Sequence, residues 1–147
     1  MRFDTETEIN ASPDRVWAVL TDVERWPEWL ASYTSVDRTD EGPLAVGSAA
    51  RVRQPGLSPA TCTVTELVPG QEFTWSSTAA GVRTTGRHVV QPLSDDRNRL
   101  ALSIEQSGLL AGLVGLLLGS KIRRFIAIDS EGLRAAAETA SGSDTHP

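Results

Sequence analysis

The stretch "SPDRVWAVLTDVERWPEWL", Ser12 to Leu30, decides how the start of this chain folds. It holds three of the four tryptophans of the protein, Trp17, Trp26 and Trp29. A serine followed directly by Pro13 is typical of a helix N-cap and its first helical residue. The apolar residues that come next repeat at the helical period: Val16, Val19, Leu20 and Val23. The stretch therefore predicts a helix that begins at Pro13.

A second short helix is expected directly after the first. Asp22 is a suitable second N-cap, and Pro27 restricts the residue before it, so we expect this helix to end near Trp26. Before Ser12, charged residues alternate with Phe3, Thr5, Thr7 and Ile9, which predicts a strand with one solvent-exposed face. The chain thus opens with one strand followed by two short helices.

The middle of the chain has the residue pattern of β-strands joined by turns. Segments rich in valine, threonine and aromatic residues alternate with turn clusters, and Pro69-Gly70 fits the centre of a type II turn. We expect strands at about residues 33–40, 48–54, 60–68, 71–78, 82–92 and 98–106. Because the connections are short, these strands form an antiparallel meander. Their alternation places nine side chains on one face: Cys62, Val64, Phe73, Trp75, His88, Val90, Leu100, Leu102 and Ile104.

The last element, from about Leu109 to Ala140, has a helical pattern, and residues 141–147 form a polar tail that we expect to be disordered. One stripe of this helix is apolar: Leu118, Ile122, Phe125, Ile126, Leu133 and Ala136. The order β-α-α-β6-α predicts an α+β fold in which a curved, seven-stranded antiparallel sheet wraps around the long C-terminal helix. The sheet and helix enclose space, and the opening tryptophans serve as lid and wall.

Composition narrows the function classes. The length of 147 residues suits one domain, which we place at residues 1–140. The net charge of −5 argues against a nucleic-acid partner, since that binding depends on basic residues. A single cysteine excludes an intramolecular disulfide and a thiolate metal cluster. No secretory signal is visible and the longest apolar run, Leu109–Leu118, is too short to span a membrane, so we expect a cytoplasmic protein.

Four segments give the chain its resemblance to a known family. They are "INASPDRVWAVLTDVERWPEWL", "VGSAARVRQPGL", "VTELVPGQEFTW" and "RHVVQPLSDDRNRLALSIEQSG". In this order they are similar to the polyketide cyclase/dehydrase and lipid-transport group of the START/Bet v 1-like (SRPBCC) superfamily, the helix-grip fold. The resemblance covers about residues 3–138. It implies an internal cavity for a hydrophobic or amphipathic, lipid- or polyketide-like molecule, with no cofactor or metal and no family-wide catalytic signature.

Ten residues are predicted to form the wall of this cavity. They are Cys62, Val64, Phe73, Trp75, His88, Val90, Leu102, Ile104, Leu118 and Ile122. Two titratable residues are candidates for chemistry. His88 shares a strand face with Val90; it is either a cavity-wall histidine satisfied by a neighbour, or a ligand contact or general acid/base. Asp129 falls inside the apolar stripe; it either pairs with Arg124 or another surface cation, or joins His88 in an acid/base pair.

The segment "GLLAGLVGLLLGS", Gly108–Ser120, allows three interpretations. The glycines Gly112, Gly115 and Gly119 lie on one helix side, and the leucines of Leu109–Leu117 lie on the opposite one. We expect the glycines to lie close to the sheet while the leucines pack under neighbouring loops. Alternatively, the leucines are exposed as a homodimer or lipid-docking face, or the helix breaks near Gly119 and its first part is a mobile gate.

Three functions follow as hypotheses. The first is the binding or carrying of a hydrophobic small molecule in the cavity. The second is a cyclase/dehydratase-type enzyme with His88 as acid/base and Asp129 as its partner. The third is an interaction protein that docks through the Leu109–Leu117 face.

Overall fold

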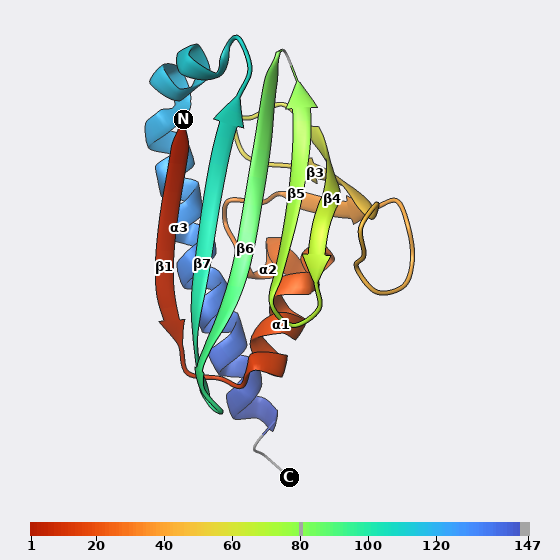
Figure 1. Ribbon diagram of the computed structural model, residues 1–147, viewed down its shortest axis with the longest axis vertical. Helices are drawn as coiled ribbons and strands as arrows, with labels where there is room; N and C mark the ends of the chain where they lie inside the picture. Colours follow the sequence, from red (N-terminus) through yellow and green to blue (C-terminus); the bar gives the residue numbers. More distant parts are fainter. Residues whose placement is uncertain (80, 145–147) are drawn as a thin grey trace.

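A computed structural model describes residues 1–79 and 81–144, with side chains described as far as Thr139. The described residues form one seven-stranded antiparallel sheet in the order β1-β7-β6-β5-β4-β3-β2, so the predicted meander is confirmed. The long helix α3 (Ala111–Asp144) crosses one face of this sheet (Figure 1). The strands are β1 (Arg2–Ile9), β2 (Ser35–Arg38), β3 (Ala49–Arg53), β4 (Ala60–Val68), β5 (Glu72–Ala79), β6 (Val82–Ser94) and β7 (Arg97–Ser107).

The first helix, α1 (Pro13–Thr21), begins where the sequence predicts. Ser12 is its N-cap, and the side-chain oxygen accepts a hydrogen bond from the backbone N–H of Arg15 at 3.2 Å. Val16, Val19 and Leu20 are buried, so the predicted apolar stripe faces the core. In Figure 1 this helix lies with the following short helices beside the lower half of the sheet.

The predicted end of the second helix near Trp26 is wrong. A 3₁₀ turn, η1 (Val23–Arg25), leads directly into a short helix, α2 (Trp26–Trp29), with Pro27 in its first turn. Proline is tolerated there because the first N–H groups of a helix have no partner within the helix. Asp22 caps η1 without a side-chain hydrogen bond.

The predicted turn between β4 and β5 is confirmed. Gly70 has a φ of +76°, as the third residue of a type II turn requires. The N–H of Gln71 donates to the carbonyl oxygen of Val68 at 3.0 Å and closes the turn. This tight connection fixes the register in which Phe73 lies opposite Leu67, and a register shift between Glu66 and Val64 then brings Trp75 opposite Val64.

Helix α3 is continuous from Ala111 to Asp144, so the predicted alternative of a break near Gly119 is wrong. It extends four residues beyond the predicted end at Ala140, and residues 145–147 of the predicted tail lie outside the described residues. It packs mainly on β1, β7 and α1. Among the described residues, no helix has both the length and the apolar character needed to cross a membrane.

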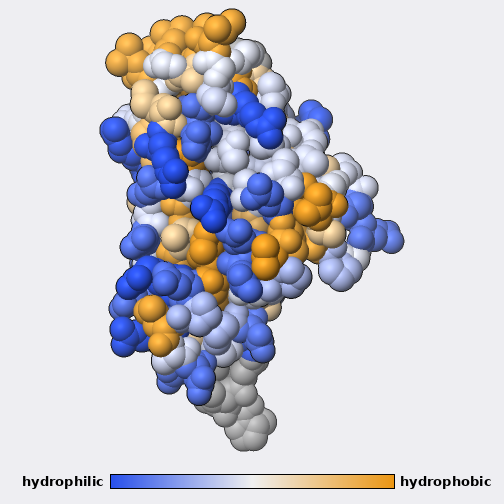
Figure 2. All heavy atoms as spheres, in the orientation of Figure 1, coloured by the Kyte–Doolittle hydropathy of each residue, from blue (hydrophilic) through white to orange (hydrophobic). Residues whose placement is uncertain are grey.

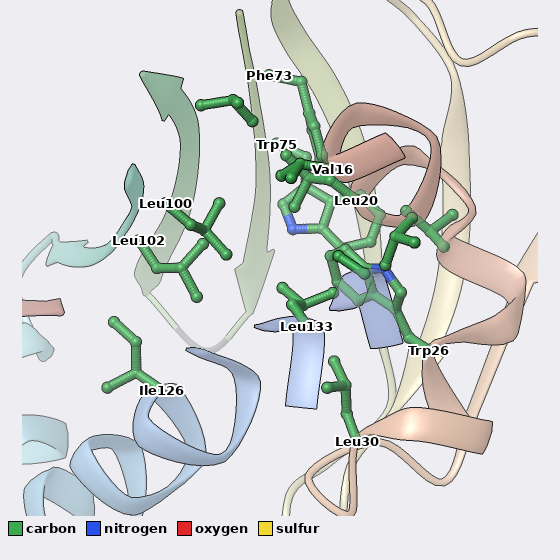
Figure 3. Close-up of a cluster of buried hydrophobic side chains, with 14 of the residues drawn as sticks. Val16, Leu20, Trp26, Leu30, Phe73, Trp75, Leu100, Leu102, Ile126 and Leu133 are labelled. Atoms are coloured by element: carbon green, nitrogen blue, oxygen red, sulfur yellow. The ribbon is translucent and has the colours of Figure 1, made fainter. Parts of the chain in front are cut away.

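Side chains from the sheet, α1, α2 and α3 converge on one hydrophobic core (Figure 3). Ile9, Phe73 and Leu100 are fully buried on the sheet side of this core. Trp26 and Leu30 enter it from α2 and the residue after it, and Leu133 enters it from α3. The short helices α1 and α2 and the long helix α3 therefore pack together over the concave face of the sheet, as the helix-grip arrangement requires.

Candidate functional site

A cavity of about 400 Å³ lies between the concave face of the sheet and α3. Strands β3 to β7 provide one wall, and α3 provides the opposite wall from Val114 to Leu133. Trp26, Leu30 and Tyr33 close one end, which we call the aromatic end. The volume lies within the range of small-molecule sites in proteins, roughly 300–1,000 Å³.

Seven of the ten predicted wall residues line this cavity. They are Cys62, Trp75, His88, Leu102, Ile104, Leu118 and Ile122. The other three, Val64, Phe73 and Val90, are buried in the core and lie outside the cavity lining. Strand alternation gives the face of the sheet on which a side chain lies, but not its height along the strand. At the height of these three residues, helical side chains fill the concave face.

An aromatic cluster forms the wall at the aromatic end. The rings of Phe73 and His88 are stacked, with centroids 4.2 Å apart and an angle of 13° between them. The ring of Trp26 meets that of Trp75 edge-on at 5.2 Å. Gly86 pairs with Trp75 across the sheet, and a Cβ there would lie 3.4 Å from the indole. The absence of a side chain at Gly86 leaves room for this ring.

The other two opening tryptophans do not line the cavity. Trp17 packs its ring edge-on against Phe73 at 6.4 Å and is half-buried. Trp29 lies under the guanidinium group of Arg25, 5.0 Å from its ring centroid. Of the three, Trp26 alone is a wall residue among those described as lining the cavity.

His88 is neutral in this environment. Its Nδ1 lies 3.2 Å from the carbonyl oxygen of Phe73, and because a carbonyl only accepts, Nδ1 donates this hydrogen bond. Burial lowers the pKa of the imidazole to about 4, against an ordinary value of 6.5. The ring thus has one nitrogen satisfied by the backbone and one, Nε2, with a lone pair available as an acceptor.

Asp129 is buried, and the expected pairing with Arg124 or another surface cation is wrong. Its carboxyl accepts a hydrogen bond from the hydroxyl of Ser32, a residue that is fully buried. Burial raises the pKa of Asp129 to about 7, from an ordinary 3.8, and the Ser32 hydrogen bond opposes this rise only in part. Burial, with the Asp129 carboxylate as a second cause, also raises the pKa of Tyr33 well above its ordinary value.

A missing side chain allows this contact between the α2–β2 connection and α3. A Cβ on Gly132 would lie 2.7 Å from the carbonyl oxygen of Trp29 and 2.4 Å from a methyl group of Leu30. Gly132 lies one helical turn after Asp129, on the same side of α3. The connection therefore approaches the helix backbone closely enough for Ser32 to reach the carboxyl. The sequence interpretation missed both Ser32 and Gly132; a glycine within the apolar part of the helix is the one available signal.

His88 and Asp129 both line the cavity, but they do not form the hypothesised pair. Within the described part of the chain, His88 bonds to Phe73 and Asp129 bonds to Ser32, and neither bonds to the other. Their perturbed pKa values have separate causes, since burial dominates both and neither group acts on the other. The two residues are therefore separate polar groups on the cavity wall.

Two buried polar atoms of the cavity wall have no hydrogen-bond partner among the described residues. They are the indole Nε1 of Trp26, a donor, and the side-chain Oε1 of Gln106, an acceptor. Both residues line the cavity, with 1% and 7% of their surface exposed. Buried polar groups are nearly always satisfied in folded proteins, but both atoms are themselves covered by neighbouring protein atoms, so they are unsatisfied within the wall rather than open to the cavity. No pattern in the sequence had singled out Gln106.

The described residues offer little for nucleophilic catalysis by a thiol or for metal binding. Burial raises the pKa of the Cys62 thiol to about 11, which keeps the thiol protonated and a poor nucleophile near neutral pH. In the part of the chain that the structure describes, no group of three or more histidine, cysteine, aspartate or glutamate side chains could hold a metal ion. The polar groups of the cavity wall therefore offer hydrogen bonds and, at Asp129, an ionisable carboxyl group.

At the start of α3, the glycines and leucines adopt a mixture of the predicted arrangements. Gly115 lies against the side chain of Met1 and Gly119 against the ring of Phe3, so the helix approaches β1 closely as expected. The leucines do not pack under neighbouring loops: Leu109, Leu110, Leu113, Leu116 and Leu117 are all exposed. Only Val114 and Leu118 from this segment line the cavity.

Comparison with known proteins agrees with this architecture. A family described as "Polyketide cyclase / dehydrase and lipid transport" matches residues 1–138 of the chain. Comparison of the sequence with curated proteins gives no match.

Solved structures show the same fold at low sequence identity. The Zhui aromatase/cyclase from Streptomyces sp. R1128 is 20% identical, with a TM-score of 0.77 over 94% of this chain and 93% of that one. A START superfamily protein from Mycobacterium smegmatis is 16% identical, with a TM-score of 0.70 over 98% and 99%. Norcoclaurine synthase from Thalictrum flavum is 17% identical, with a TM-score of 0.72 over 93% of each chain.

Proposed function

We propose that this chain, which belongs to the family of polyketide cyclases/dehydrases and lipid-transport proteins, binds a hydrophobic or amphipathic small molecule in the cavity between its sheet and α3. The observation that carries this proposal is a cavity of about 400 Å³ with largely apolar walls that also carry two buried polar side chains, His88 and Asp129. An apolar ligand would bury its surface against Leu102, Leu118 and Ile122. Hydrogen-bonding groups on it would meet His88 and Asp129.

The polar side chains of the wall define the chemistry of this ligand further. The neutral His88 offers an acceptor nitrogen, Nε2, that suits a hydroxyl group. An amphipathic molecule with a hydroxyl substituent therefore fits the wall better than a pure hydrocarbon, which would leave this nitrogen unsatisfied.

Occupation of the cavity can be tested by filling it. Leu118→Trp places an indole ring in the cavity from a partly buried position, whereas Leu116→Trp places the same ring on an exposed position of the same helix. A fluorescent apolar probe, N-phenylnaphthylamine, is titrated into each protein. We expect Leu118→Trp to weaken binding by about tenfold or more, roughly 1.4 kcal/mol, and Leu116→Trp to leave it unchanged. Equal affinities in all three proteins would place the probe outside the cavity and contradict the proposal.

A second candidate function is an enzyme of the cyclase/dehydratase type, and the Asp129 carboxyl is the observation that favours it. A pKa of about 7 lets the same group give or take a proton near neutral pH, as general acid–base catalysis requires. His88 is less suited to the role proposed from the sequence, because a pKa of about 4 makes it a weak base and leaves almost no imidazolium to act as acid. We therefore assign the acid/base role in this alternative to Asp129, held by Ser32.

The two functions differ in what happens to the bound molecule. A carrier releases its ligand unchanged, whereas a dehydratase releases a product lighter by one water. Ligand extracted from the wild-type protein and from Asp129→Asn is compared by mass spectrometry. Identical masses support binding alone. A heavier molecule trapped only in Asp129→Asn supports the enzyme.

A further inference from the structure

Five leucines at the start of α3 form an exposed apolar cluster, which we call the leucine tip. Leu109, Leu116 and Leu117 expose 99%, 80% and 70% of their surface. Leu110 and Leu113 expose 45% and 53%. Figure 2 shows a dense apolar cluster at the end of the molecule where α3 begins, uppermost in that view. Scattered exposed leucines are ordinary, but a contiguous group of this kind marks an interaction site.

The packing of α3 explains why these side chains point outward. At 100° per residue, the first turns of the helix have three sides. The glycine side lies on β1, where Gly115 contacts Met1 and Gly119 approaches Phe3. Val114 and Leu118 face the cavity. The leucines occupy the remaining side. They are covered neither by the packing of the helix on β1 nor by the cavity wall.

Basic residues lie directly behind the leucine tip. Residues 106–128 contain no aspartate or glutamate, although the whole chain carries a net charge of −5. This segment contributes Lys121, Arg123 and Arg124, one to two turns further along the helix. Arg123 and Arg124 are exposed on the leucine side, whereas the ammonium group of Lys121 lies against Gly56 of the β3–β4 connection. None of the three pairs with a carboxylate among the described residues; Arg123 instead lies 5.3 Å from the ring centroid of Phe3.

The neighbouring hairpin adds a further cation and no acid. Residues 73–94 of β5, β6 and their turn contain no aspartate or glutamate. Arg83 lies opposite Ser107 in the sheet, two residues before the leucine tip begins. Gly81 contacts Leu110, so this turn and the helix start lie side by side. One end of an acidic protein thus combines exposed leucines with a majority of basic residues, the exposed acid at this end of β7 being Glu105, which lies opposite Thr85.

This combination discriminates between possible partners. A second copy docked symmetrically on the same face would bring the cations of both copies together, and like charges repel. A bilayer with anionic lipids offers an apolar interior for the leucines and negative headgroups for the basic residues behind them. The order along the helix, leucines at the tip and cations behind, matches the order of hydrocarbon and headgroup in that surface.

We propose that the leucine tip docks this protein on an anionic lipid surface, with the leucines inserted at the interface and Arg83, Arg123 and Arg124 against the headgroups. The proposal does not depend on what the cavity binds. Val114 and Leu118 connect the two regions, because they line the cavity from the same helical turns. Docking would therefore bring this end of the cavity to the membrane.

Vesicle sedimentation of the full chain tests the proposal. One set of vesicles contains phosphatidylcholine alone, and the other contains about one third phosphatidylglycerol, which gives the surface its negative charge. We expect binding to the anionic vesicles to be about tenfold stronger or more, and to weaken as salt screens the charges. The double variant Leu113→Glu/Leu117→Glu should lose this binding. Leu93→Glu, at a 39% exposed position on the far end of β6, should retain it.

Several results would overturn the proposal. These are failure of the wild-type protein to sediment with anionic vesicles, or equal sedimentation of the double variant. A wild-type dimer that the double variant converts to a monomer, without vesicle binding, would show that the face mediates self-association instead. Circular dichroism checks that the variants are folded, as expected for exposed positions. Probe binding in vesicle-free buffer separates this outcome from failure of the proposed cavity function.

Discussion

The aromatic end of the cavity and the leucine tip are built in opposite ways. At the aromatic end, Trp26 is 1% exposed and its ring meets four other aromatic rings, including that of His88. At the leucine tip, Leu109 is 99% exposed, and even the most covered leucine, Leu110, is 45% exposed. Both regions are rich in large apolar residues. Composition alone thus does not decide whether such residues hold the fold together or meet something outside it.

This contrast shows how a small domain separates stability from interaction. A chain of this size needs a continuous core, and the aromatic end supplies much of it together with α1 and α3. Residues that stabilise the core are expected to be costly to change, and residues of the leucine tip cheap to change. Of the three predictions that follow, the first two test this contrast, the larger expected effect first.

The largest effect is expected from truncating the central ring of the aromatic end. Trp26→Ala should lower the free energy of unfolding by about 3–5 kcal/mol, because it leaves a large cavity among tightly packed rings. Leu116→Ala, at the leucine tip, should change it by less than about 0.5 kcal/mol. Urea denaturation measures both. A similar loss in the two variants would contradict the contrast between the regions.

A pair of glycine substitutions on α3 sharpens the contrast with matched chemistry. At Gly132 an added Cβ meets backbone at 2.7 Å, so Gly132→Ala should cost about 1–3 kcal/mol despite the better helix propensity of alanine. At Gly112 an added Cβ meets nothing within 4 Å, so Gly112→Ala should stabilise by about 0.5 kcal/mol. Urea midpoints compare the two directly. Stabilisation by both substitutions would show that the connection does not press on α3.

The third prediction concerns the pH dependence of stability contributed by Asp129. Since burial raises its pKa from 3.8 to about 7, its contribution to stability is fully present below pH about 4 and is lost as pH rises through about 7. His88 acts oppositely: its pKa is lowered from 6.5 to about 4, so its contribution is lost as pH falls through that window. The two effects partly cancel in the wild-type protein.

Asp129→Asn removes one of these two effects and leaves the other. The variant should gain stability relative to the wild-type protein as pH rises from about 4 to about 7. Urea denaturation at several pH values measures this difference. A difference that does not vary with pH would mean that Asp129 ionises as an ordinary surface carboxylate does.

Much of the fold was predictable because it follows from local periodicity. Alternation along the strands correctly placed Trp75, His88 and Leu102 on the concave face, and the 3.6-residue period placed Ile122 and Leu133 against the core. The capping residue Ser12 fixed the start of α1. The exception, Pro27, begins a helix where it was expected to end one, because the same residue is compatible with both positions.

The candidate site was harder to predict because it depends on distances between segments. Ser32 and Asp129 are 97 residues apart in sequence, and only the close approach at Gly132 brings them together. Without that contact, Asp129 was assigned to a surface ion pair. The leucines were expected to be covered for a similar reason: an amphipathic pattern shows which residues share a side of a helix, but not whether anything packs on that side.

Native mass spectrometry of the gently purified protein tests most directly whether the cavity holds a small molecule. We predict a wild-type species that carries one non-covalent apolar or amphipathic adduct, and a Leu118→Trp variant that carries none because the indole fills the space. Leu116→Trp should keep the adduct. The same adduct on all three proteins would contradict a site in the cavity, as would a wild-type protein that carries none and takes up no N-phenylnaphthylamine.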